Sequence, residues 1–141
     1  MNTEQYRFIR GALRANAAFS VLSSLPLLLA PGAMANLLGV NAPVWVLPAL
    51  AIGLLGFAAF VWWVSSREQA SLKLINTVSA MDVLWVLGSA EILIFELISF
   101  SAAGKAMVLI IALCVGMFAA AQIWGVLRAR RARIAEGAGA I

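Results

Sequence analysis

The stretch PVWVLPALAIGLLGFAAFVWWV at residues 43–64 decides the fold, because none of its side chains is charged. About 20 helical residues, at about 1.5 Å of rise each, cross about 30 Å of hydrocarbon. An uncharged apolar run of this length is typical of a transmembrane helix. The stretch AMVLIIALCVGMFAAAQIWGVL at residues 106–127 repeats the pattern. The chain therefore contains at least two predicted membrane spans.

Two further apolar stretches, at residues 11–30 and 74–100, complete the expected set of spans. Hydrophobic residues make up 64% of the chain and charged residues 11%, against about 45–50% and about 25% in soluble domains. A soluble chain of 141 residues could not bury so much apolar surface in one core. We predict a single-domain, all-α, integral membrane four-helix bundle, followed by a basic tail at residues 128–141.

The connection between the first two spans is predicted to hold a short interfacial helix. Pro31 suits the first turn of such a helix, and Gly39 suits the residue that ends it. The residues between them are uncharged and largely apolar. We therefore expect this helix to lie at the outer surface of the membrane.

The first span has a second interpretation, as a cleavable signal peptide. Basic residues, an apolar stretch and the small-residue sequence Ala33-Met34-Ala35 are all typical of such a peptide. Asn16, Ser20, Ser23 and Ser24 make the stretch more polar than the core of a signal peptide, which favours a retained helix. The chain has four spans if this helix is retained and three if it is cleaved.

The basic residues predict the orientation. Lys105 alone lies on one predicted side of the membrane, and nine of the ten basic residues lie on the other: Arg7, Arg10, Arg14, Arg67, Lys73, Arg128, Arg130, Arg131 and Arg133. Lys and Arg favour the cytoplasmic side, so we expect both termini in the cytoplasm. The tryptophans agree, because Trp45 falls at the predicted outer boundary and Trp62, Trp63 and Trp124 at the inner one.

The composition excludes several kinds of chemistry. The chain has no histidine and a single cysteine, Cys114, whereas catalytic triads, the usual zinc sites and disulfide relays need histidine or several cysteines. The sequence also lacks a phosphate-binding motif. We therefore expect neither an enzyme nor a cofactor or metal site. The net charge of +4 lies at helix ends, which indicates an anionic membrane surface rather than a nucleic acid as the partner.

Ionisable residues inside a membrane are costly and mark functional sites by default. The third span holds three of them: Asp82, Glu91 and Glu96. At 100° per residue, Asp82, Ser89 and Glu96 share one helix face, with Ser79 and Trp85 to either side. Glu91 lies about 180° away from Asp82, so two faces of this span carry carboxyl groups.

Depth predicts which polar residues meet. Asp82 lies about 12 Å inside the cytoplasmic end of its span, and Arg14, Asn16 and Gln122 lie at comparable depth in the first and fourth spans. We predict a cluster of these four side chains, with Trp85 packed against it. Two interpretations stay open: a structural Arg14–Asp82 ion pair with amide neighbours, or a binding or proton-handling site open to the cytoplasm.

Glu91 is harder to explain, because it is expected near the middle of the membrane without a basic partner in any span. It is expected to be protonated, since burial disfavours the charged form, or to face an oligomer interface, or to line a cavity. The sequence does not decide among these three.

Two short stretches suggest relatives. LRANAAFS at residues 13–20 and DVLWVLGS at residues 82–89, with Gln122 ahead of the basic tail, resemble small bacterial four-span membrane proteins of unassigned function. The resemblance implies a four-span topology in a bacterial inner membrane. It implies no activity.

These observations favour a non-catalytic membrane subunit or an assembly or binding module. The alternative is a small oligomeric transporter or channel that uses Asp82 or Glu91 as a proton, cation or ligand site. The candidate site residues are Arg14, Asn16, Asp82, Trp85, Ser89, Glu91 and Gln122. The expected partners are the lipid bilayer and either a second copy of the chain or another membrane protein.

Overall fold

A computed structural model describes residues 3–67 and 71–138, without the side chains of Thr3, Gln5, Arg133 and residues 135–138. These ranges fold into five helices: α1 (Thr3–Leu29), α2 (Pro31–Leu38), α3 (Val46–Ser66), α4 (Leu72–Ile94) and α5 (Ala102–Ala138). Within the described ranges, α1, α3, α4 and α5 are each long and apolar enough to cross a membrane. The predicted all-α, four-span bundle is confirmed, and the protein is a small membrane protein.

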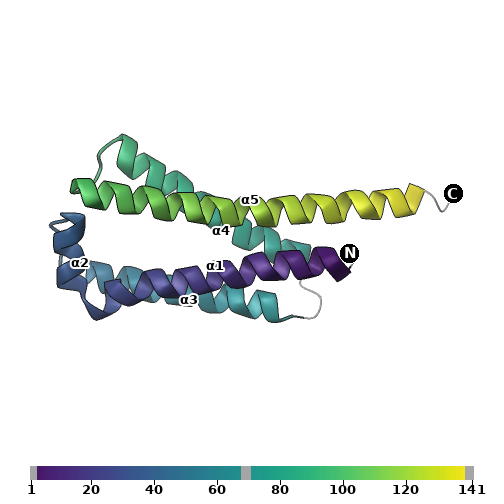
Figure 1. Ribbon diagram of the computed structural model, residues 1–141, viewed down its shortest axis with the longest axis horizontal. Helices are drawn as coiled ribbons and strands as arrows, with labels where there is room; N and C mark the ends of the chain where they lie inside the picture. Colours follow the sequence, from purple (N-terminus) through teal and green to yellow (C-terminus); the bar gives the residue numbers. More distant parts are fainter. Residues whose placement is uncertain (1–2, 68–70, 139–141) are drawn as a thin grey trace.

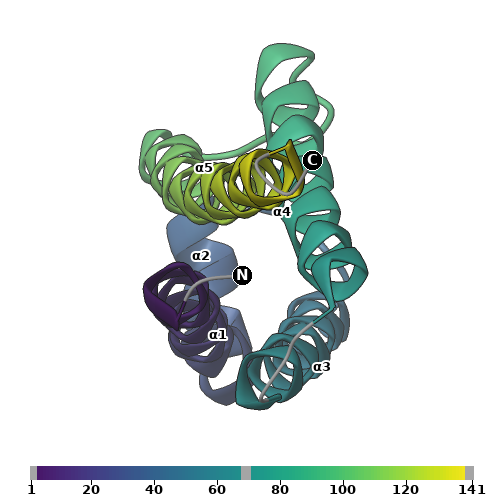
Figure 2. The ribbon, with the colours of Figure 1, turned by 90° about the vertical axis from the view of Figure 1, so that its right-hand side faces the viewer.

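The four long helices associate as two pairs. α1 packs along α3, and α4 packs along α5, while α1 also contacts α5. α3 and α4, although consecutive in the sequence, contact each other little. Figure 2, viewed along the bundle, shows α4 leading away from α3 across the side of α5. The bundle is therefore an α1/α3 pair joined to an α4/α5 pair.

Both ends of the chain lie at the same end of the bundle (Figure 1), which we call the terminal end; the opposite end carries α2 and is called the α2 end. α5 extends beyond the other helices at the terminal end. The tail expected after residue 127 is thus helical to Ala138. Alanine and arginine are strong helix formers, and no glycine or proline interrupts residues 126–136.

The short helix predicted in the first connection is present as α2. Pro31 occupies its first turn, and Gly39 ends it in the left-handed conformation with φ 71°, as glycine permits at little cost. Two carbonyls at the end of α2 accept hydrogen bonds from Ser101: Leu38 O from the backbone N–H, at 2.8 Å, and Leu37 O from the hydroxyl, at 2.7 Å. Ser101 thereby joins α2 to the start of α5.

Ser101 also caps α5, because its Oγ accepts a hydrogen bond from Gly104 N at 3.0 Å. This junction requires glycine at position 104. A Cβ there would lie 2.4 Å from Leu38 O, which is far closer than van der Waals contact. The α2 end is therefore held together by a close backbone approach.

The third span ends earlier than expected. α4 stops at Ile94, so residues 95–100 lie outside the helix. Glu96 adopts a positive φ of 49°, and Leu97 N donates to Ile92 O at 3.2 Å, as in a Schellman motif. Glycine is the usual residue at such a position, so a glutamate there gave the sequence analysis no signal for the helix end.

The Glu96 carboxylate lies beside the first basic residue of α5. Lys105 Nζ is 2.6 Å from Glu96 Oε1, and this hydrogen bond, followed by the charge of Lys105, lowers the pKa of Glu96. Both side chains are well exposed, so the pair contributes little to stability. The pair places two charged side chains at the α2 end.

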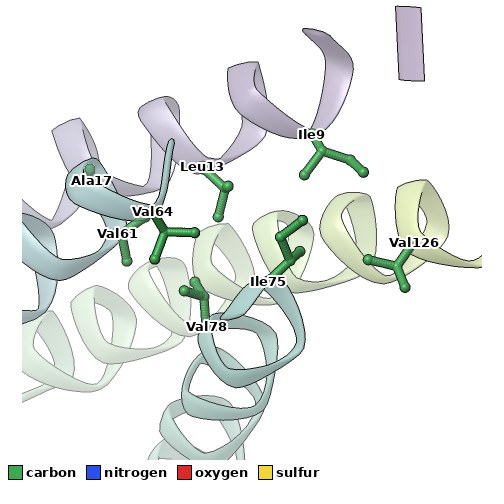
Figure 3. Close-up of a cluster of buried hydrophobic side chains, with 8 residues drawn as sticks. All are labelled: Ile9, Leu13, Ala17, Val61, Val64, Ile75, Val78 and Val126. Atoms are coloured by element: carbon green, nitrogen blue, oxygen red, sulfur yellow. The ribbon is translucent and has the colours of Figure 1, made fainter. Parts of the chain in front are cut away.

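At the terminal end, an apolar cluster connects all four long helices. Figure 3 shows its side chains converging from α1, α3, α4 and α5: Ile9, Leu13, Ala17, Val61, Val64, Ile75, Val78 and Val126. Around the outside of the bundle, large apolar side chains such as Leu22, Ile52, Leu84 and Met117 are exposed. A membrane protein presents such surfaces to lipid.

Basic and aromatic side chains combine at the terminal end. Arg10 Nε donates to Ser65 O at 2.8 Å, which satisfies a carbonyl in the last turn of α3. The guanidinium of Arg67 lies 4.0 Å from the ring centre of Trp63, and that of Arg128 lies 4.8 Å from Trp124. These stacked pairs suit the membrane–water boundary, where amphipathic side chains collect.

Candidate functional site

The polar residues of three helices meet at Asp82, the only aspartate in the chain. Asn16 Nδ2, from α1, donates to Asp82 Oδ2 at 2.7 Å. Gln122 Nε2, from α5, donates to the same oxygen at 3.1 Å. Ser79 Oγ, one turn before Asp82 on α4, lies 3.0 Å from Gln122 Oε1. We call Asn16, Ser79, Asp82 and Gln122 the polar cluster.

The local sequence turns these side chains inward. On α1, Asn16 lies on the face that Leu13, Ala17 and Ser20 also bury, as the i, i+3, i+4 spacing of a helix requires. On α5, Gln122 follows buried Ala119 by three residues. Asn16 and Gln122 are 0% exposed and Asp82 is 1% exposed, so the cluster lies wholly inside the chain.

The polar cluster links the two helix pairs. Asn16 belongs to the α1/α3 pair, whereas Asp82 and Gln122 belong to the α4/α5 pair. The Asn16–Asp82 hydrogen bond is thus a polar contact across the boundary between the pairs. Interhelical hydrogen bonds of this kind contribute about 0.6 kcal/mol on average and at most about 1.7 kcal/mol in a membrane.

Two buried polar atoms beside this bond have no hydrogen-bond partner among the described residues: Asn16 Oδ1 and Trp85 Nε1. Leaving a buried polar group unsatisfied costs about 1–3 kcal/mol. Trp85 follows Asp82 by three residues on α4, so the two side chains are neighbours on one helix surface. The cluster therefore has one unused acceptor, on Asn16, and the neighbouring Trp85 has one unused donor.

Arg14 does not join the cluster, and its predicted ion pair with Asp82 is wrong. Its side chain is exposed, and its guanidinium carbon lies 5.6 Å from the ring centre of Trp62 on α3. The reason is angular: positions 14 and 16 of one helix point about 200° apart. Because Asn16 faces inward, Arg14 faces outward at the same depth.

The expected opening of the cluster toward the terminal end is also absent from the described structure. On each of the three helices that supply the cluster, an apolar side chain stands nearer the terminal end than the cluster residue does, and these side chains pack together (Figure 3): Ile9 and Leu13 on α1, Ile75 and Val78 on α4, and Val126 on α5. All five are 3% exposed or less. Apolar side chains thus separate the polar cluster from the terminal end of the bundle.

Buried serines extend the polar surface from the cluster toward the α2 end. Ser20 and Ser24 lie on α1 and Ser89 on α4, and all three are buried. Each hydroxyl donates to a carbonyl of its own helix: Asn16 O, Val21 O and Trp85 O respectively. The hydroxyl protons are therefore used within the helices, and Ser89, which shares the face of Asp82, donates to its own helix rather than to the cluster.

Glu91 lies apart from the cluster. It is exposed and stands in the last turn of α4, because that helix ends at Ile94. It is therefore closer to the α2 end than the longer predicted span implied. Glu96, expected on the face of Asp82, lies beyond the helix and pairs with Lys105.

Asn16, Asp82 and Gln122 were predicted to meet, whereas Ser79 was predicted beside the face of Asp82 but not as a member of the cluster. The available signal was its spacing, three residues before Asp82 on the same helix face. Within the described residues, no group of three or more His, Cys, Asp or Glu side chains could hold a metal ion. No protein-family model matches the sequence, and no curated protein or solved structure matches it significantly.

Proposed function

We propose that the protein is a non-catalytic membrane module, a subunit or assembly partner, in which the polar cluster fixes how its two helix pairs associate. The observation that carries this proposal is the Asn16–Asp82 hydrogen bond, which joins α1 to α4. The pairs also meet where α1 contacts α5 and in the apolar cluster at the terminal end, and the hydrogen bond adds a directional contact to these apolar ones. A module of this kind would act through the positions of its outer helix faces.

The experiment measures the distance between the pairs in lipid nanodiscs. Spin labels at Ala59 of α3 and Leu113 of α5, both exposed, report on it in a Cys114→Ser background. Asn16→Leu removes an interhelical hydrogen bond, so we expect the population of separated pairs to rise about threefold to twentyfold. Asn76→Leu, the same change at an exposed site of α4, is the control. An unchanged distance distribution in Asn16→Leu would contradict the proposal.

The second candidate is a small transporter or channel that binds a proton or cation at Asp82. It is favoured by the burial of this carboxyl group without a basic side chain beside it in the described ranges. Proteoliposomes holding the purified protein distinguish the two functions. A transporter would carry protons or monovalent cations and lose this flux in Asp82→Asn, whereas a module would show no flux above that of empty liposomes.

We further propose that the protein lies in a bacterial inner membrane with its terminal end in the cytoplasm. The nine basic residues on that side support the orientation. In a Cys114→Ser background, a membrane-impermeant thiol reagent applied to intact spheroplasts should label A33C, in α2, but not I134C, in the extension of α5. Lysis of the spheroplasts should expose I134C to the reagent. Labelling of I134C before lysis would reverse the topology.

A further inference from the structure

The carboxyl group of Asp82 receives both of its hydrogen bonds on one oxygen. Asn16 Nδ2 and Gln122 Nε2 both donate to Oδ2, and no side chain in the described ranges is seen to donate to Oδ1. The residue is 1% exposed. The other oxygen of this carboxyl group, Oδ1, therefore has no donor among the described side chains.

The side-chain amide of Asn16 also has one atom without a hydrogen-bond partner. Its Nδ2 is bound to Asp82, while its Oδ1 is buried and has no donor. Exchanging Oδ1 and Nδ2 of Asn16 would place the amide oxygen against the oxygen of Asp82. The hydrogen bond to Asp82 therefore assigns the nearer amide atom as nitrogen. The atom that lacks a donor thus belongs to the amide already bound to Asp82.

Among the described side chains, none supplies a positive charge beside Asp82 that would compensate its ionised form. On α1 the nearest charged residue is Arg14, which points outward over Trp62. α3 carries no charge between Val46 and Ser66, and α5 carries none between Lys105 and Arg128. On α4, Lys73 and Glu91 are each nine residues away and exposed. An isolated charge in such surroundings is strongly disfavoured.

We propose that Asp82 is a proton-binding site: its Oδ1 carries a proton and donates it to Asn16 Oδ1. A carboxylic acid and a primary amide each present a donor beside an acceptor. The Oδ1–H bond to Asn16 Oδ1, together with the Nδ2–H bond to Asp82 Oδ2, closes a ring of two hydrogen bonds. Gln122 Nε2 continues to donate to Oδ2.

The proton gives Asn16 Oδ1 a hydrogen-bond donor, and it also neutralises the negative charge of Asp82. The proton comes from water, and no counter-ion is needed. This proposal deepens the second candidate function, proton binding at Asp82, by assigning the two atoms that share the proton. This proposal and the proposed module fail separately, since the infrared band of Asp82 reports its protonation, whereas the spin labels report the distance between the helix pairs.

Infrared spectroscopy tests the proposal directly, because Asp82 is the only aspartate in the chain. Protein labelled with side-chain ¹³C-aspartate therefore reports on this one carboxyl group in the full-length, unmodified chain. In nanodiscs at neutral pH, we expect the isotope to shift the carbonyl band of a protonated carboxylic acid. An isotope shift in the carboxylate bands alone, with none in the acid band, would overturn the proposal.

Two variants test the hydrogen bond of the ring. Asn16→Leu should move the acid band to higher frequency, as expected for a carbonyl and hydroxyl that lose partners, whereas the control Asn76→Leu should leave the band unchanged. Asp82→Asn supplies an N–H donor where the protonated acid has its O–H, so the ratio of folded to unfolded protein in this variant should stay within about tenfold of the wild-type ratio. A loss of about tenfold or more would show that an ionised carboxylate makes these bonds.

Discussion

Asp82→Leu should lower the free energy of unfolding by about 2–4 kcal/mol. Leucine fills a similar space but accepts no hydrogen bond, so Asn16 Nδ2 and Gln122 Nε2 lose their shared acceptor while both remain buried. Each orphaned group costs about 1–3 kcal/mol. Part of this cost is recovered because polar groups of the unfolded chain also find partners within a bilayer.

Unfolding in mixed micelles, followed by helical circular dichroism as the denaturing detergent is increased, measures this change. Glu91→Leu is the matched control, because it also replaces a carboxyl group of α4 by leucine, but at an exposed position. We expect the control to stay within about 0.5 kcal/mol of the wild type. If Asp82→Leu were as stable as Glu91→Leu, the polar cluster would not hold the helices together.

Long apolar runs predicted the helices of this protein, but not their partners. In a membrane the lipid-facing side chains are as apolar as the buried ones. The amphipathic pattern that identifies the buried face of a helix in a soluble protein is therefore weak here. Leu84 is exposed and Val78 is buried on the same helix, although both are aliphatic. The sequence therefore does not predict that α1 pairs with α3 and α4 with α5. Pro31 and Gly39, by contrast, predicted α2 because they act locally.

The candidate site could be predicted in part, and each error in that prediction has a physical cause. Depth brought Asn16, Asp82 and Gln122 together correctly, since position along a helix follows from residue number alone. Depth also included Arg14, whose direction around the helix excludes it. The apolar barrier made by Leu13, Val78 and other residues depends on how three helices meet, which no single stretch of sequence encodes.

The end of α4 shows a different limit. A helix that stops at a glutamate with positive φ gives no local signal, because glycine or asparagine normally takes that place. The charged contact at this end comes from another helix, since Lys105 on α5 pairs with Glu96, although this exposed pair adds little stability. The α2 end is therefore set by contacts with α5, among them the close approach of Gly104 to Leu38.

Gly104→Ala should lower the free energy of unfolding by about 1–3 kcal/mol, the usual cost of an extra methyl group in a filled space. The added Cβ would lie 2.4 Å from Leu38 O, and a backbone carbonyl cannot turn aside as a flexible side chain can. The start of α5 would have to move away from α2. That movement would also weaken the bond from Ser101 N to Leu38 O, now 2.8 Å long.

Gly53→Ala provides the control, because no atom lies within 4 Å of the Cβ that it adds to α3. Within a helix this change should be neutral or should stabilise the protein by about 0.5–1 kcal/mol, through the lower backbone entropy of alanine. The same detergent titration measures both variants. A result in which Gly104→Ala matched Gly53→Ala would mean that α2 does not press against α5, and the α2 end would then be free to move apart without loss of stability. The opposite signs expected for one identical change make the close approach of the two helices, rather than helix propensity, the cause of the difference.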